Sequence, residues 1–149
     1  MEVYTIGFTQ KSAEQFFELL NANNINLVLD IRLNNSNQLS GFAKEKDLKY
    51  FLSKISNVNY AHELRFSPTK ELLDNYKNKR ITWQEYEVIY KKLLKERNVE
   101  KVLEEEYKNK LDKICLLCSE ARPEKCHRKL LAEYIKDTFK FDDIKIIHL

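Results

Sequence analysis

The stretch INLVLDIR, residues 25–32, decides the fold class of this chain. It is an almost continuous apolar run that ends in Asp30 and Arg32. A strand with one face in water alternates apolar and polar residues, whereas a strand covered on both faces is apolar along its length. Strands of the second kind belong mainly to parallel sheets with helices on both sides. The stretch therefore predicts a buried strand of a parallel sheet.

The rest of the chain alternates between strand and helix patterns. Further strands are expected in VYTIGF (3–8), NVNYAHEL (57–64), KICLLCSE (113–120) and DIKIIHL (143–149). Helices are expected after Ser12, within 44–55, 67–78 and 81–97, on to about residue 110, and from Pro123 onward. Two of them begin with a capping box, from Ser12 to Gln15 and from Thr82 to Glu85. This alternation predicts an α/β fold, a single domain over residues 1–149 with a mainly parallel, Rossmann-like sheet and helices on both faces.

Composition limits the class of protein and its partners. With 149 residues, of which 43% are hydrophobic and 33% charged, the chain is expected to bury one self-sufficient core. It has no apolar run that would span a bilayer and no secretory pattern, so we expect a cytoplasmic protein with no membrane partner. A net charge of +3 and a pI near 8.6 are too weakly basic to favour a dedicated duplex binder. Nucleic acid stays open as a partner, and the sequence does not determine the oligomeric state.

Polar residues follow the predicted strands. Those at or just after a strand's carboxyl end include Thr9, Asp30, Arg32, Cys118 and Glu120, and His62 and Glu63 follow a further strand with ordinary structural roles equally open to them. In an open parallel sheet these ends lie along one edge, and ligands bind there. The helix expected from Pro123 would begin at the same edge and carry Cys126, His127 and Arg128. We therefore predict one site at this edge of the sheet.

The segment LLCSEARPEKCHRKLLAEYI, residues 116–135, has three interpretations, of which the first is a zinc site. Cys115, Cys118, Cys126 and His127 are all ligand types that zinc uses. Geometry opposes this, because Cys115 and Cys118 are three residues apart on a strand and point to opposite faces. The adjacent Cys126 and His127 also lack the usual spacer of a ligand pair. We predict no bound metal and no cofactor.

The second interpretation is a reactive thiol. Three cysteines in a chain with no secretory signal favour free thiols. Cys118 leaves its strand at the edge of the sheet, and Cys126 would lie in a first helical turn, where the helix dipole and nearby basic residues stabilise a thiolate. Either is a candidate nucleophile, and the two could form a redox pair. Either could equally be a buried structural residue. Cys115 is expected to be a small buried hydrophobe.

The third interpretation is an anion site. Free N–H groups at the start of the helix after Pro123, together with Arg32 and Arg128, would suit a phosphate or carboxylate. His127 could act as an acid or base oriented by Glu120 or Asp30, although ordinary structural roles are equally open to these residues. We expect a small ligand that is anionic or nucleotide-like.

An aromatic-rich helix pattern at 81–97 offers a stacking platform for bases as one interpretation. Trp83, Tyr86 and Tyr90 recur there at helical spacing, with Ile89, Leu93 and Leu94 among them. This spacing is more typical of a helix face that packs on a core. We therefore predict that these side chains are buried.

Several motifs resemble one known family. They are YTIGFT (4–9), VLDIRLNNSNQLSGFA (28–43), ITWQEYE (81–87) and, most specifically, LLCSEARPEKCHR (116–128). Together they span nearly the whole chain, which resembles the bacterial and archaeal family named domain of unknown function 488. The resemblance implies a single α/β domain with the same edge residues, and the family's name supplies no activity.

The leading hypothesis is a cysteine-dependent transferase or hydrolase acting on a phosphorylated or nucleotide-like substrate. In it, Cys118 is the nucleophile, with His127 and Glu120 as its catalytic partners. The residues expected to bind the ligand are Thr9, Asp30, Arg32, Cys126 and Arg128. Two alternatives stay open: a non-catalytic module that binds nucleic acid or protein, and a redox sensor that uses its thiols.

Overall fold

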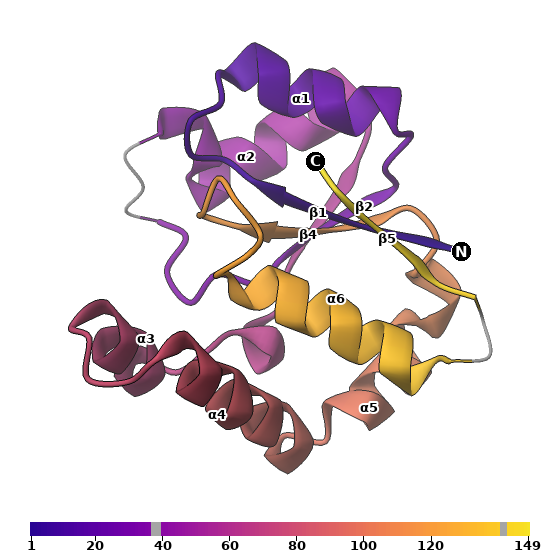
Figure 1. The fold of residues 1–149 in the computed structure, drawn as a ribbon. Helices are drawn as coiled ribbons and strands as arrows, with labels where there is room; N and C mark the ends of the chain where they lie inside the picture. Colours follow the sequence, from indigo (N-terminus) through magenta and orange to yellow (C-terminus); the bar gives the residue numbers. More distant parts are fainter. Residues whose placement is uncertain (37–39, 141–142) are drawn as a thin grey trace.

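A computed structural model describes residues 1–36, 40–140 and 143–149. Five strands form one sheet in the order β3-β2-β4-β1-β5 (Figure 1). Their bounds are β1 Glu2–Gly7, β2 Leu27–Asp30, β3 Asn59–His62, β4 Ile114–Cys118 and β5 Lys145–His148. Every neighbouring pair of strands is parallel. The predicted α/β fold with a parallel sheet is confirmed.

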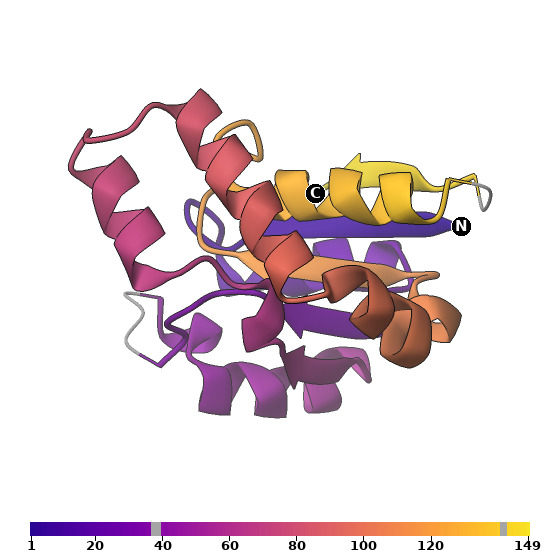
Figure 2. The ribbon, with the colours of Figure 1, turned by 90° about the horizontal axis from the view of Figure 1, so that it is seen from below.

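Helices cover both faces of this sheet (Figures 1 and 2). On one face lie α1 (Ala13–Ala22) and α2 (Glu45–Phe51), and on the other α3 (Lys70–Lys77), α4 (Trp83–Glu96), α5 (Val99–Val102) and α6 (His127–Thr138). Short 3₁₀ turns occur at Gly41–Ala43, Leu64–Phe66 and Lys108–Lys110, and π-helical turns at Leu52–Ser56 and Leu103–Tyr107. Among the helices described, none has the length and apolar character needed to cross a membrane.

The central strand β4 divides the core into two apolar clusters. Its residues alternate, so that Ile114 and Leu116 join the cluster under α4 and α6, while Cys115 and Leu117 join the cluster under α1 and α2. All five residues of β4 are buried. Because the period of a strand is two, Cys115 and Cys118 point to opposite faces, as the sequence predicted.

Both predicted capping boxes are present. Ser12 Oγ accepts a hydrogen bond from the Gln15 N–H, and the Gln15 side chain accepts one from the Ser12 N–H. Thr82 and Glu85 make the same reciprocal pair at the start of α4. Each box satisfies two backbone N–H groups that a helix otherwise leaves without partners. These short polar patterns therefore determine where α1 and α4 begin.

Two local predictions are wrong. The helix expected from Pro123 begins only at His127, with Cys126 as its N-cap residue, because a turn closed by the Cys126 N–H on the Pro123 carbonyl precedes it. The side chains expected in the core from 81–97 are not all buried, because Ile89 is 43% exposed and Trp83 and Leu93 are only partly buried. Tyr86, Tyr90 and Leu94 form the buried stripe of α4, and Ile89 lies outside this i, i+4 row.

Candidate active site

A pocket of about 290 Å³ opens at the carboxyl edge of the sheet, beside the ends of β2 and β4. Cys118, Cys126 and His127 form its chemically active side. Three aromatic residues, Tyr76, Trp83 and Tyr86, line it from α3 and α4. The other polar residues that line it include Arg32, Ser119, Glu120 and Lys125. Thiols, a histidine, cations and aromatic rings thus meet in one hollow.

Cys118 is the last residue of β4, and its side chain is 4% exposed. A hydrogen bond from Cys126 is the largest influence on its pKa, which is lowered. Burial opposes this, but the charge of Arg128 and the backbone N–H groups of Ser119 and Glu120 add to the lowering. A sulfur surrounded by donors in this way favours the thiolate.

Cys126 is the partner thiol. It is buried, and its pKa is raised because it shares a hydrogen bond with Cys118 and because burial disfavours its charged form. The two shifts have opposite directions since one sulfur donates and the other accepts. Of the two sulfurs, Cys118 therefore favours the thiolate and Cys126 the thiol.

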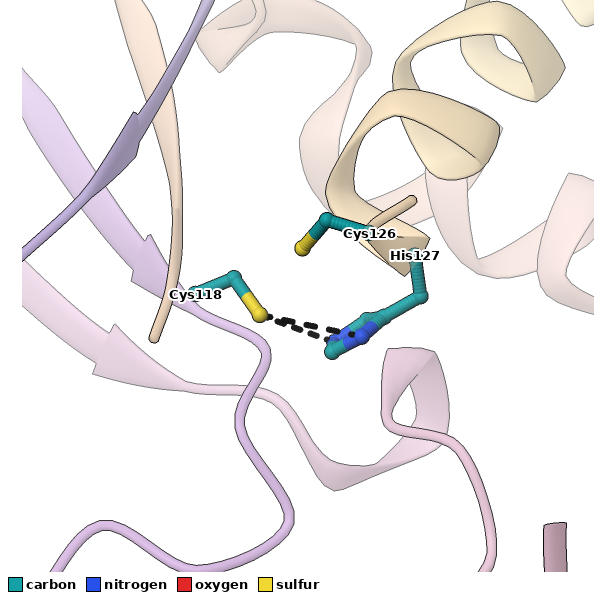
Figure 3. Close-up of side chains that lie close together, drawn as sticks. All are labelled: Cys118, Cys126 and His127. Atoms are coloured by element: carbon teal, nitrogen blue, oxygen red, sulfur yellow. Dashed lines mark hydrogen bonds between the residues drawn. The ribbon is translucent and has the colours of Figure 1, made fainter. Parts of the chain in front are cut away.

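His127 begins α6, beside both sulfurs (Figure 3). Its Nε2 lies 3.0 Å from the Ile31 carbonyl oxygen, which only accepts, so Nε2 carries the proton and Nδ1 is free to act as a base. The Cys118 sulfur is 3.7 Å from Nδ1 and 3.8 Å from Nε2. A sulfur almost equally far from both nitrogens does not lie along the lone pair of either. His127 is thus held by Ile31 rather than by a linear bond to Cys118.

Arg32 lines the pocket although its side chain is only 2% exposed. Its Nε and Nη2 donate to the two carboxylate oxygens of Asp30 at 2.8 and 2.7 Å. Burial raises the pKa of Asp30, but hydrogen bonds from Arg32 and Tyr60 outweigh it, and the pKa is lowered. Within the described part of the chain, Nη1 of Arg32 is buried with no hydrogen-bond partner. An unsatisfied buried donor costs about 1–3 kcal/mol.

Arg128, completely buried, supports the loop after β4 instead of lining the pocket. Its guanidinium donates to the carbonyl oxygens of Glu120 and Ala121. The end of β1 passes very close to this loop, since a Cβ built at Gly7 would lie 1.6 Å from the Glu120 oxygen. Gly7 and Arg128 together set the position of the backbone N–H groups that face the Cys118 sulfur.

Five of the eight predicted site residues line this pocket: Arg32, Cys118, Glu120, Cys126 and His127. The other three lie behind it. Asp30 pairs with Arg32, Arg128 holds the loop, and Thr9 donates from its Oγ1 to the Ser119 carbonyl oxygen at 2.6 Å while facing a different hollow beside α1. The structure therefore separates pocket residues from residues that position them.

The sequence offered a stacking platform on the helix at 81–97 as one interpretation, but core packing was preferred. Tyr86 and Tyr90 are buried, as expected of a core helix face. Trp83, however, is only partly buried and lines the pocket beside Tyr76 of the preceding helix. The cluster of aromatic residues was the available signal, but their helical spacing fits a core and a pocket wall equally well.

Three of the four residues considered as zinc ligands do converge. Nitrogen or sulfur atoms of Cys118, Cys126 and His127 lie within 4.8 Å of one another, and Cys115 is on the other face of the sheet. Soft ligands of this kind suit zinc, which takes four ligands in structural sites and three plus an open position in catalytic ones. Only the second arrangement is compatible with these three side chains.

Comparisons with known proteins identify a family and nothing more specific. The family model described as "Domain of unknown function DUF488" matches residues 12–135. No curated protein and no solved structure matches the chain.

Proposed function

The chain belongs to the DUF488 family, whose name assigns no activity, and we propose from the site that it is a cysteine-dependent transferase or hydrolase acting on an anionic substrate. The observation that carries this proposal is the surroundings of Cys118. Its sulfur lines a pocket, lies 3.7 Å from Nδ1 of His127 and within 4.8 Å of the Cys126 sulfur, and has a lowered pKa. A thiolate stabilised in this way is the reactive form of cysteine.

The neighbouring groups suit a two-step displacement. In the first step, the Cys118 thiolate attacks the electrophilic atom of the substrate, a sulfur–substrate bond forms, and the leaving group departs with its electron pair as an anion near Arg32 and Lys125. In the second step, Nδ1 of His127 takes a proton from water or an acceptor hydroxyl, which attacks the intermediate and regenerates the thiolate. The proton on His127 then passes to the leaving group. The roles of acid and base both fall to His127.

The other two cysteines are poorer candidates for the nucleophile. Cys115 is buried on the opposite face of the sheet, and burial raises its pKa. Cys126 also has a raised pKa, because its proton is held in the bond to Cys118. Both stay protonated at neutral pH.

Alkylation at graded pH, followed by mass spectrometry, tests this proposal. Cys118 is expected to react with iodoacetamide well below pH 8.5, where a free thiol titrates, and Cys118→Ser removes that reaction. Cys115, unreactive in the folded protein and alkylated in denaturant, is the internal control. If all three cysteines react only after unfolding, the proposal fails. If Cys118 reacts only after a chelator is added, the site is a metal centre and the proposal of a free reactive thiol fails.

A thiol redox pair is the second candidate function. It is favoured by the closeness of Cys118 and Cys126, whose sulfurs belong to one cluster within 4.8 Å. Oxidation by a peroxide would remove two hydrogens from the protein and join these residues. Peptide mapping that finds both cysteines reduced after peroxide treatment would exclude this function while leaving the first intact.

A further inference from the structure

The aromatic side of the pocket has no role in the proposed cysteine chemistry. Trp83 and Tyr86 stack with their ring centroids 4.8 Å apart and their planes at 15°. Tyr76 lies 5.5 Å from Trp83 and 5.4 Å from Tyr86. Tyr86 is buried, but Tyr76 and Trp83 are each only partly buried where they line the pocket. The pocket therefore presents aromatic surface that the core does not use.

A polar anchor lies in the same pocket. Arg32 lines the pocket although its side chain is only 2% exposed. Its Nη1 has no hydrogen-bond partner among the described residues. Asp30 holds the other end of this guanidinium rigidly, through Nε and Nη2. Lys125 lines the pocket from the loop and is exposed. Lys125 is thus the accessible cation for an anionic group in this pocket.

We infer that the pocket binds a planar aromatic ring joined to a single anionic group, the chemistry of a nucleoside monophosphate. The ring packs against Trp83 and Tyr76, and the anion lies beside the ammonium group of Lys125, in the pocket that Arg32 also lines. This inference rests on the proposed function, for which it names the substrate class. Small-molecule pockets span about 300–1,000 Å³, so a pocket of about 290 Å³ suits one ring with one anionic group better than a dinucleotide.

Stacking on an aromatic side chain tolerates any base, because every base has a π-face. The ring should therefore contribute affinity without selecting strongly among bases. Removal of one stacking partner weakens binding of a base by about tenfold or more.

The chain's single tryptophan makes the test direct, because Trp83 is the only residue of its type. We would titrate the full chain with AMP, UMP, phenyl phosphate, ribose 5-phosphate and inorganic phosphate, and record tryptophan fluorescence and binding heat. AMP and UMP are expected to quench Trp83 and to bind at least tenfold more tightly than ribose 5-phosphate. Phenyl phosphate separates the two sources of a ring: if it binds as tightly as AMP, the ligand is an aromatic phosphate and not specifically a nucleotide. Equal binding of AMP and ribose 5-phosphate overturns the inference, as does saturation by none of the probes.

Variants localise the binding. Trp83→Leu should weaken AMP binding by about tenfold, whereas Trp83→Phe keeps a ring and most of the affinity. Val88→Ala, on the exposed face of the same helix, is the matched control and should change nothing. Arg32→Ala would leave Asp30 unpaired and destabilise the fold, so Lys125→Ala is the better probe of the anionic group. This variant should bind AMP more weakly and adenosine with unchanged affinity. Unchanged AMP affinity in Trp83→Leu contradicts the inference.

Binding to Cys118→Ser separates this inference from the proposed function. If AMP binds this variant normally while the wild-type thiol proves unreactive, the ligand class stands and the enzyme mechanism fails. If the thiol is reactive and no ring-bearing probe binds, the mechanism stands and the ligand class is wrong.

Discussion

The pKa values of Cys118 and Cys126 shift in opposite directions because the fold gives the two thiols different partners. Cys118 receives backbone N–H groups and the field of Arg128 at the end of a strand. Cys126, the N-cap of α6, makes no side-chain hydrogen bond to the helix backbone, so its thiol is available to Cys118. The pair is asymmetric although both residues are buried.

Replacement of Cys126 should therefore change the chemistry of Cys118. Cys126→Ala removes the donor, and the pKa of Cys118 should rise, since a hydrogen bond to a charged group stabilises the charged form. Cys126→Ser keeps an O–H donor and should retain most of the lowering. The pH dependence of Cys118 alkylation measures both. The same midpoint in all three proteins would show that Cys126 does not support the thiolate.

Gly7 offers a second prediction at this scale. In Gly7→Ala the new Cβ would overlap the Glu120 carbonyl oxygen, so β1 or the loop after β4 must move. We therefore expect the free energy of unfolding to fall by about 1–3 kcal/mol. Gly41→Ala is the matched control, because nothing lies within 4 Å of its Cβ and a change within about 0.5 kcal/mol is expected. Denaturant unfolding measures both variants, and equal stabilities would refute the close approach.

At the scale of elements, the start of α4 couples helix stability to the pocket. The capping box of Thr82 and Glu85 fixes the first turn, and Trp83 follows it directly. The start of α1 has the same kind of capping box, formed by Ser12 and Gln15, and neither of these residues lines this pocket. The two boxes therefore allow helix stability and pocket geometry to be separated.

We expect Thr82→Ala and Ser12→Ala each to lower the free energy of unfolding by about 1 kcal/mol, the usual cost of a lost N-cap. Only Thr82→Ala should also shift the emission of Trp83 in the folded protein, because only that helix start carries the tryptophan. Thermal unfolding and fluorescence spectra measure the two effects. An equal emission change in Ser12→Ala would mean that the pocket responds to general destabilisation.

At the scale of the whole molecule, the ion pair of Asp30 and Arg32 ties the end of β2 to its surroundings. Both side chains are at most 2% exposed, and Tyr60 of β3 donates to the same carboxylate at 2.6 Å. Because the pKa of Asp30 is lowered by folding, the pair stabilises the protein above about pH 3.9, where the unfolded carboxyl is ionised. This contribution is lost as the pH falls through the lower folded pKa.

Asp30→Asn should lower the free energy of unfolding by about 3–5 kcal/mol at neutral pH, since it leaves Arg32 buried without a counter-charge. Its stability should also depend less on pH in the acid range. Glu96→Gln is the control, because the Lys92–Glu96 pair is exposed and should contribute less than about 1 kcal/mol. Urea unfolding from pH 3 to 7 measures both, and an acid profile of Asp30→Asn that matches the wild type would contradict this account.

Local patterns in the sequence were sufficient for the parallel sheet, the helices and both capping boxes. Burial of a strand on both faces requires a run such as INLVLDIR, and a capping box involves residues only three apart. The edge of the sheet where the site lies also followed, because all parallel strands end on the same side. The start of α6 was predicted too early, at Pro123, because a proline fits a turn as well as a first helical position.

Only the tertiary structure decided which of these residues share a pocket. Asp30, Thr9 and Arg128 looked like ligand-binding residues, but in the folded chain their hydrogen bonds hold Arg32 and the loop after β4. Trp83 looked like a core residue, and the packing of α3 against α4 leaves it at the pocket beside Tyr76. The physical reason is the same in each case: a residue's own type and local spacing determine its element, whereas its neighbours across the fold determine its pKa, its partners and its exposure.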